Sequence, residues 1–371
     1  MSIIVQKYGG SVLSDISKIR SIAGKIADLQ AEGNKVVAVV SAMGNATDDL
    51  IMLANSVSLN PPKREMDMLL SVGERISMSL LAMAIFETGK AKAISYTGSQ
   101  VGIITDNHHS DAKIVAIQCD RIKKALDEGF AVIVAGFQGV SFEKEITTLG
   151  RGGSDTTALA IAAALNADRC DLIKEVPGLF TSDPSLLPEA MRIPEMDYES
   201  VKNLSLGGAR ILKDDCIDLA EKYGIEIRVG DAKYQSIIKK WTEKPFFSLA
   251  LKEKMRLIKV KTADYLRMDI EEQEVYLVDD SVYIAADLSE AKNIMIDNAE
   301  ITDNVSMITG VGENIGRLLK TAYNDKDISK IMVAYQNSKM MKIIFVSNEP
   351  KQILKRLHTV FADFFNDSVK E

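Results

Sequence analysis

The sequence predicts an α/β protein with a three-layer domain around a mainly parallel sheet, followed by smaller α+β units of the ferredoxin-like kind. Three observations lead to this prediction. Apolar runs of strand length alternate with amphipathic helical segments through residues 1–230, and glycine-rich loops follow several of these runs. Beyond residue 253 the strand-like runs come closer together and two of them flank a helical segment.

Six short runs rich in β-branched residues are predicted to form the sheet. Several are apolar throughout, which is typical of strands buried on both faces of a parallel sheet. The runs are Ile3–Val5, Val36–Val40, Ala93–Ser95, Ala131–Ala135, Cys170–Ile173 and Ile225–Val229.

Helical periodicity fills the stretches between these runs. Over Ile16–Leu29, apolar residues recur at three- and four-residue spacing. Ser14 is expected to cap the start of this helix and Gly33 to end it. Met66–Phe86 and Thr156–Leu165 are predicted to be further helices.

We predict a large domain over residues 1–232, a linker over 233–255, a shortened first α+β unit over 256–303 and a second unit over 304–371. Pro245 and mixed charges indicate the linker. The strands expected beyond it are Leu257–Val260, Val275–Val278, Val282–Ala285, Val305–Thr309, Ile331–Tyr335 and Lys342–Ser347, and the helices are Asn314–Tyr323 and Lys351–Phe364.

The composition favours a cytoplasmic globular protein. Of the 371 residues, 46% are hydrophobic and 26% charged, and the net charge of −7 argues against nucleic acid or an anionic membrane as the main partner. Cys119, Cys170 and Cys216 lie far apart, which fits neither a zinc site nor a disulfide framework. We see no secretory leader at the start and no apolar stretch expected to span a bilayer.

Three polar, glycine-rich loops are predicted at the carboxyl ends of strands, where ligands bind in open α/β sheets. The first is Lys7–Ser11, with Gly9 and Gly10 opening a helix; a lysine beside exposed backbone N–H groups suits a phosphate. Taken alone, it is equally a tight turn with a solvated lysine. The other two loops are Ser41–Gly44 and Thr148–Thr157, and three such loops together favour a ligand site.

The same blocks resemble those of aspartate kinases, within the amino-acid kinase superfamily. Lys7–Ser11 is similar to the KFGGT signature of that family, and further blocks follow in the family's order. These are Ser41–Gly44, Gly73–Ser77, Ala135–Gly139 and Thr148–Asp155. The resemblance covers nearly all of residues 3–230, and the C-terminal units resemble regulatory ACT domains.

The resemblance implies transfer of the γ-phosphoryl group of ATP to the β-carboxylate of L-aspartate, at the start of lysine, threonine and methionine biosynthesis. It implies ATP with Mg²⁺ as the substrate complex and a homodimer formed through the ACT-like units. The catalytic residues would be Lys7 and Asp155. Substrate would be bound by Glu74, Arg151, Thr47 and Ser154, and nucleotide phosphate by Gly9, Gly10, Ser11, Ser41, Phe180, Asp183 and Arg210.

Departures from the family pattern fall on the nucleotide side. Lys174, Glu175, Phe180 and Ser185 stand where the family usually has Thr, Asp, Tyr and Arg, and Arg210 replaces a lysine. A kinase for another acidic substrate and a catalytically weak regulatory paralogue are the alternatives. Because residues 261–274 are too few for a full ACT-like unit, we expect a weak response, or none, to lysine or threonine.

Overall fold

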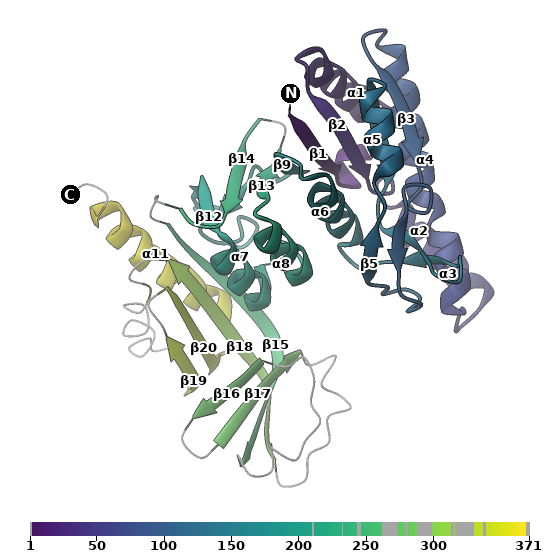
Figure 1. Cartoon of the computed structure of the whole chain (residues 1–371). Coiled ribbons are helices and arrows are strands. Elements are labelled where there is room, and N and C mark those ends of the chain that lie inside the picture. Colours follow the sequence, from purple (N-terminus) through teal and green to yellow (C-terminus); the bar gives the residue numbers. More distant parts are fainter. Residues whose placement is uncertain are drawn as a thin grey trace. The chain divides into compact units, whose positions relative to one another are not determined.

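The computed structural model describes residues 2–209, 211–231, 233–242, 246–261, 274–278, 281–287, 299–312, 315, 330–336 and 339–368. These residues form two compact units. The first comprises residues 1–179, 194–198 and 212–242, and the second comprises residues 180–193, 199–211 and 243–371. Figure 1 labels the elements of both units.

The first unit is built on an eight-stranded sheet with strand order β12-β14-β13-β9-β1-β2-β6-β3. Neighbouring strands from β13 to β3 are parallel, whereas β14 is antiparallel to β13. The mainly parallel sheet is therefore confirmed. The strands are β1 (Ile3–Tyr8), β2 (Lys35–Val40), β3 (Lys92–Tyr96), β6 (Phe130–Ala135), β9 (Arg169–Ile173), β12 (Glu195–Asp197), β13 (Glu226–Gly230) and β14 (Gln235–Lys239).

Helices cover both faces of this sheet. Ile19, Ile22 and Ile26 of α1 (Ile16–Ala31) and Leu81 and Ile85 of α4 (Val72–Glu87) share one buried cluster with alternate residues of β1, β2 and β6. Because side chains alternate along a strand, the remaining residues face the opposite layer. That layer contains α6 (Gly153–Leu165), which packs on β1, β2 and β9, and α8 (Asp214–Tyr223), which packs on α6.

A smaller sheet of order β5-β4-β7-β8 lies beside the large one. Its strands are β4 (Ile103–Thr105), β5 (Ile114–Ile117), β7 (Gln138–Ser141) and β8 (Ile146–Thr148). Helix α3 (Lys63–Leu70) packs against β8. The first unit also contains η1 (Ser11–Leu13), α2 (Ala46–Val57) and α5 (Asp120–Asp127), whereas η2 (Ser205–Ala209) and all but the first residue of α7 (Tyr198–Leu204) belong to the second unit.

The second unit contains an antiparallel sheet of order β16-β17-β15-β18-β20-β19. Helix α11 (Pro350–Ser368) lies against it (Figure 1), and Ile353, Leu357 and Phe361 pack on Phe247 and Phe345. The strands are β15 (Phe247–Lys261), β16 (Glu274–Val278), β17 (Ser281–Asp287), β18 (Glu300–Gly312), β19 (Lys330–Gln336) and β20 (Met340–Val346), and β10 (Leu179–Phe180) pairs with β11 (Arg192–Ile193).

All twelve predicted strands are present, but several finer predictions were wrong. The α1 cap is Asp15, whose side chain accepts from the Lys18 N–H, and not Ser14. Met66–Phe86 is two helices with a break at Ser71. The predicted linker over 233–255 contains β14 and much of β15. The predicted helix Asn314–Tyr323 lies outside the described residues, as does most of the 261–274 segment.

One stretch, Lys63–Glu87, is long and apolar enough to span a bilayer by length and composition alone, contrary to our expectation. It comprises α3 and α4, and half of its most apolar window is buried inside the protein. Asp67 and Glu74 are among its buried residues. Packing in the first unit therefore explains the buried apolar side chains of this stretch, whereas others, such as Ile76, Met83 and Phe86, are exposed.

Candidate active site

Lys7 and Asp155 form the centre of the predicted site. Lys7 is near the end of β1 and Asp155 is in the first turn of α6, and the distance from Lys7 Nζ to Asp155 Oδ1 is 2.7 Å. Both side chains are 11% exposed. A lysine held this way by a carboxylate is fixed in direction, as a cation that stabilises developing charge must be.

The first two predicted loops are joined by their backbones. The Gly44 N–H donates to the Gly10 carbonyl at 2.9 Å, and the Ser41 N–H donates to the Tyr8 carbonyl at 3.1 Å. Gly10 directly precedes η1, and Ser11 is exposed. The structure therefore brings together Gly9, Gly10 and Ser41 at the carboxyl ends of β1 and β2, and their role as a phosphate cradle stays a prediction.

Glu74 is a buried carboxylate on α4, only 3% exposed. Its Oε1 accepts from the Ala42 N–H at 3.1 Å, whereas its Oε2 has no hydrogen-bond partner in the described part of the chain. Burial raises the pKa of Glu74 to about 7, against the opposing effects of the backbone N–H groups and Lys7. Buried polar atoms are usually satisfied, so an orphaned carboxylate oxygen is a candidate ligand contact.

The predicted site residues of the third loop differ from one another in exposure and surroundings. Arg151 is exposed, and the described residues offer its side chain no ion pair. Ser154 is buried inside α6, which begins at Gly153 with Gly152 as its N-cap. Thr47 is half-buried in the first turn of α2.

The predicted nucleotide-side residues belong to the second unit. Phe180 is the second residue of β10, and Asp183 is exposed, with its Oδ1 accepting from the Ser185 N–H at 2.8 Å. Arg210 lies outside the described residues. Their placement around a nucleotide stays a prediction.

Gly9 and Gly10 differ in the room that they leave for a side chain, which gives a test of the cradle. A Cβ on Gly9 would meet the Ile173 carbonyl oxygen at 3.7 Å and Lys7 Nζ at 3.9 Å. A Cβ on Gly10 would lie 2.8 Å from the Ala42 carbonyl oxygen. We expect Gly9→Ala to keep its free energy of unfolding within about 1 kcal/mol but to lose nucleotide binding, and Gly10→Ala to lose about 1–3 kcal/mol of stability.

Urea unfolding measures the stability of both variants, and a nucleotide titration measures their binding. Gly24→Ala in α1 is the control, because a Cβ there meets nothing within 4 Å. Wild-type nucleotide affinity in a stable Gly9→Ala variant would remove Gly9 from the cradle.

Sequence reasoning missed a second buried carboxylate, Asp67 on α3. It is fully buried, and it accepts from Thr148 Oγ1 at 2.6 Å and from the Ser110 N–H at 3.0 Å. The distance from its Oδ2 to His109 Nδ1 is 2.6 Å, whereas His108 pairs with Asp106. The two adjacent histidines therefore have different partners. The sequence signal that could have identified Asp67 is an acidic residue between the apolar residues of Met66–Leu70.

Asp67→Ala should destabilise the protein by about 2–4 kcal/mol, because it leaves several buried donors without an acceptor. Glu65→Ala on the same helix is the matched control, since Glu65 is 62% exposed in its surface pair with Arg64. Equal urea midpoints for the two variants would show that the Asp67 network contributes little.

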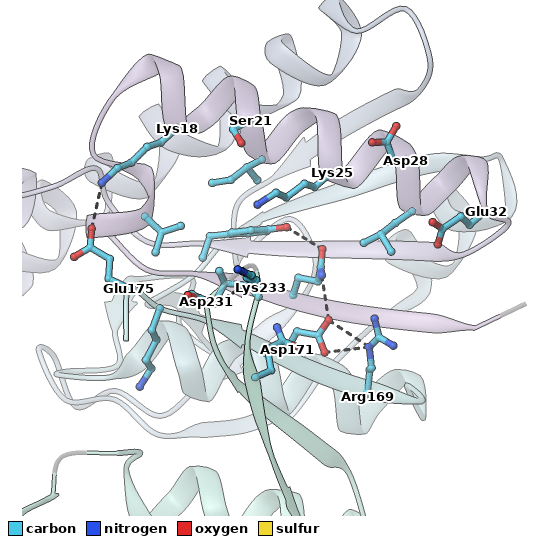
Figure 2. Close-up of a pocket in the computed structure, with 18 residues that line it drawn as sticks. Lys18, Ser21, Lys25, Asp28, Glu32, Arg169, Asp171, Glu175, Asp231 and Lys233 are labelled. Atoms are coloured by element: carbon cyan, nitrogen blue, oxygen red, sulfur yellow. Dashed lines mark hydrogen bonds and ion pairs between the residues drawn. The ribbon is translucent and has the colours of Figure 1, made fainter. Parts of the chain in front are cut away.

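One hollow of the first unit is lined by neither Lys7 nor Asp155, although its lining includes Lys174. It is a groove of about 770 Å³ beside α1, and its lining includes Gln6, Tyr8 and Asp171. Figure 2 shows two ion pairs among the lining residues, one between Asp171 and Arg169 and one between Lys18 and Glu175. Gln6 and Tyr8 alternate with Lys7 along β1, so the groove lies on the other face of the sheet.

Comparison with known proteins agrees with this arrangement. The amino acid kinase family matches residues 2–231, and the chain belongs to that family. It is 51% identical over 230 residues to an aspartokinase of Mycolicibacterium smegmatis, covering 62% of this chain and 54% of that one. It is 49% identical over 229 residues to an aspartokinase of Geobacillus stearothermophilus, covering 62% and 56%. The chain thus spans about half the length of these curated relatives.

Among solved structures, the fold is similar to Escherichia coli aspartokinase III in complex with aspartate and ADP. The TM-score is 0.80 at 21% identity, covering 96% of this chain and 99% of that one. Aspartate kinase from Synechocystis is 28% identical with a TM-score of 0.59, covering 97% and 69%. The similarity to aspartokinase III extends over both units and shows the fold.

Proposed function

We propose that this chain is an aspartate kinase, which phosphorylates the β-carboxylate of L-aspartate with ATP to give 4-phospho-L-aspartate. The observation that supports this most directly is the Lys7–Asp155 pair beside the glycine loop, in the same unit as the buried, half-satisfied carboxylate of Glu74. The high identity of residues 2–231 to proteins named aspartokinase supports the choice of substrate.

The chemistry asks little of the protein beyond positioning and charge. The aspartate carboxylate, with an ordinary pKa of about 3.9, is ionised at neutral pH, so the attack needs no general base. Its oxygen bonds to the γ-phosphorus as the bond to the bridging oxygen of ADP breaks. Lys7 would stabilise the charge on the transferring group, and Asp155 would keep the ammonium of Lys7 aimed at it.

Substrate recognition would use both signs of charge. The ionised form of Glu74 would hold the substrate ammonium group through its unpaired Oε2, and Arg151 would bind a carboxylate, which its planar fork suits. The Mg²⁺ that accompanies ATP is expected mainly on phosphate oxygens. A homodimer through the C-terminal units and a cytoplasmic location complete the proposal.

ADP release in the presence of MgATP and single amino acids tests the proposal. Aspartate should be the preferred acceptor over glutamate and asparagine, and hydroxylamine should trap the acyl phosphate as a hydroxamate. Preference for another acid would indicate a related kinase, and no hydroxamate with any acid would favour a regulatory paralogue.

Arg151→Ala should raise the KM for aspartate by about 10–100-fold and change the KM for ATP by less than about threefold. The reason is that Arg151 is an exposed cation in the third loop with no ion-pair partner among the described residues. Initial rates with each substrate varied in turn decide the point, and a larger effect on ATP would reverse the assignment.

A further inference from the structure

Lys174 occupies a fixed position directly after β9. The last register pair between β1 and β9 is Tyr8 with Ile173, and the Gly9 N–H donates to the Ile173 carbonyl at 3.3 Å. The Lys174 N–H donates to the Gly230 carbonyl at 2.7 Å, which ties the backbone of Lys174 to the end of β13. Lys174 therefore directly follows β9, next to the end of the neighbouring strand β1, where the predicted phosphate loop begins.

The side chain of Lys174 reaches the same carboxylate as Lys7. Lys174 Nζ is 3.8 Å from Asp155 Oδ2, whereas Lys7 Nζ is 2.7 Å from Oδ1. Two ammonium groups thus contact one carboxylate. The carboxylate next to Lys174 in the chain, Glu175, pairs instead with Lys18 at 3.2 Å (Figure 2).

We propose that Lys174 is a second phosphate-binding cation of this site, which contacts the nucleotide phosphates directly. This inference rests on the proposed function. The 3.8 Å contact with Asp155 is longer than a hydrogen bond, so the ammonium can donate to a phosphate oxygen without breaking a short bond to Asp155. The Lys174 side chain is also 30% exposed, against 11% for Lys7, so it is the more accessible of the two.

A purely structural role for Lys174 predicts something different. Lys7 already forms an ion pair with Asp155 at 2.7 Å, so Lys174 would then add stability and leave nucleotide affinity unchanged. The direct role predicts a loss of nucleotide affinity with the fold intact. The two roles are therefore separable by measuring binding and unfolding on the same variants.

The pH dependence of binding supplies a second readout. Asp155 of α6, Lys7 of β1 and Cys216 of α8 act on the Lys174 ammonium. Burial lowers the pKa of Lys174, with Lys7 acting in the same direction and Asp155 against it. Wild-type affinity for nucleotide should therefore fall at alkaline pH before an ordinary lysine titrates, and Lys174→Arg should remove this fall because arginine stays charged.

The experiment is a calorimetric titration of MgATP and MgADP into the full chain at pH 7.5 and 9.5, with unfolding curves for each variant. Lys174→Met should weaken MgATP binding about 10–100-fold and change the KM for aspartate by less than about threefold. Lys174→Arg should bind MgATP within about fivefold of wild type at pH 7.5. Lys25→Met, on the exposed side of α1, is the control and should bind normally.

Wild-type MgATP affinity in Lys174→Met, or in Lys174→Ser should the first variant fail to fold, would overturn the proposal. The proposed function has a separate outcome. Loss of binding in Lys174→Met alongside a wild type that phosphorylates no aspartate would support the role of Lys174 and contradict the choice of substrate. Unchanged MgATP binding in Lys174→Met, alongside a wild type with full aspartate kinase activity, would contradict the role of Lys174 and support the choice of substrate.

Discussion

Lys7→Ala is expected to lower kcat with aspartate and MgATP by about 10³-fold or more, because it removes the cation that we propose stabilises the transferring phosphoryl group. Lys7 Nζ lies 2.7 Å from Asp155 Oδ1 near the end of a buried strand, whereas the other lysine at this carboxylate, Lys174, is 3.8 Å from Oδ2. Substrate affinity should change much less than kcat, since the charge that Lys7 stabilises develops during transfer.

The structure also predicts what Lys7→Ala does to folding. Asp155 would keep Lys174 at 3.8 Å, so the buried carboxylate is not left without a cation, and the loss of stability should be about 1–3 kcal/mol. Lys92→Ala at the exposed start of β3 is the control for both measurements. Turnover within a few-fold of wild type in a folded Lys7→Ala protein would exclude Lys7 from the mechanism.

The apolar strands and the loops at their ends were predictable because each depends on local sequence. Val36–Val40 has no polar residue, so only a doubly covered strand suits it, and Lys7–Ser11 combines one charge with two glycines where a strand ends. The β13–β14 pair was not predictable in the same way. Gln235–Lys239 is a short strand that pairs with both β12 and β13, and nothing in its own sequence separates it from a linker.

Side-chain networks were predicted less well than strands, because they join residues far apart in the chain. Asp67 and Thr148 are brought together only when α3 packs on β8. In the sequence, Lys174 is recognisable only as a departure from a family pattern. Its closeness to Asp155 follows from the pairing of β1 with β9 and from the packing of α6 on both strands. Pairwise contacts of this kind require the tertiary structure.

Glu74→Gln is expected to raise the KM for aspartate by about 10–100-fold and to abolish its pH dependence near neutrality. Burial raises the pKa of Glu74 from 4.5 to about 7, so in the free protein the carboxyl is mostly protonated at pH 6 and mostly ionised at pH 8. Because the substrate ammonium group pairs with the ionised form, wild-type affinity for aspartate should increase about tenfold between these values. Glutamine has the same shape but never ionises, so its profile should be flat.

Stability should respond to pH in the opposite direction. A carboxyl with a raised pKa in the folded state binds more protons there than in the unfolded chain, so its contribution is complete below about pH 4.5 and is lost as pH rises through about 7. Glu74→Gln should remove that loss, which urea unfolding at pH 5 and pH 8 measures. Glu65→Gln on the exposed side of α3 is the control for both experiments. If the wild-type KM for aspartate is flat from pH 6 to 8, or if Glu74→Gln retains the wild-type profile, then Glu74 does not bind the substrate ammonium.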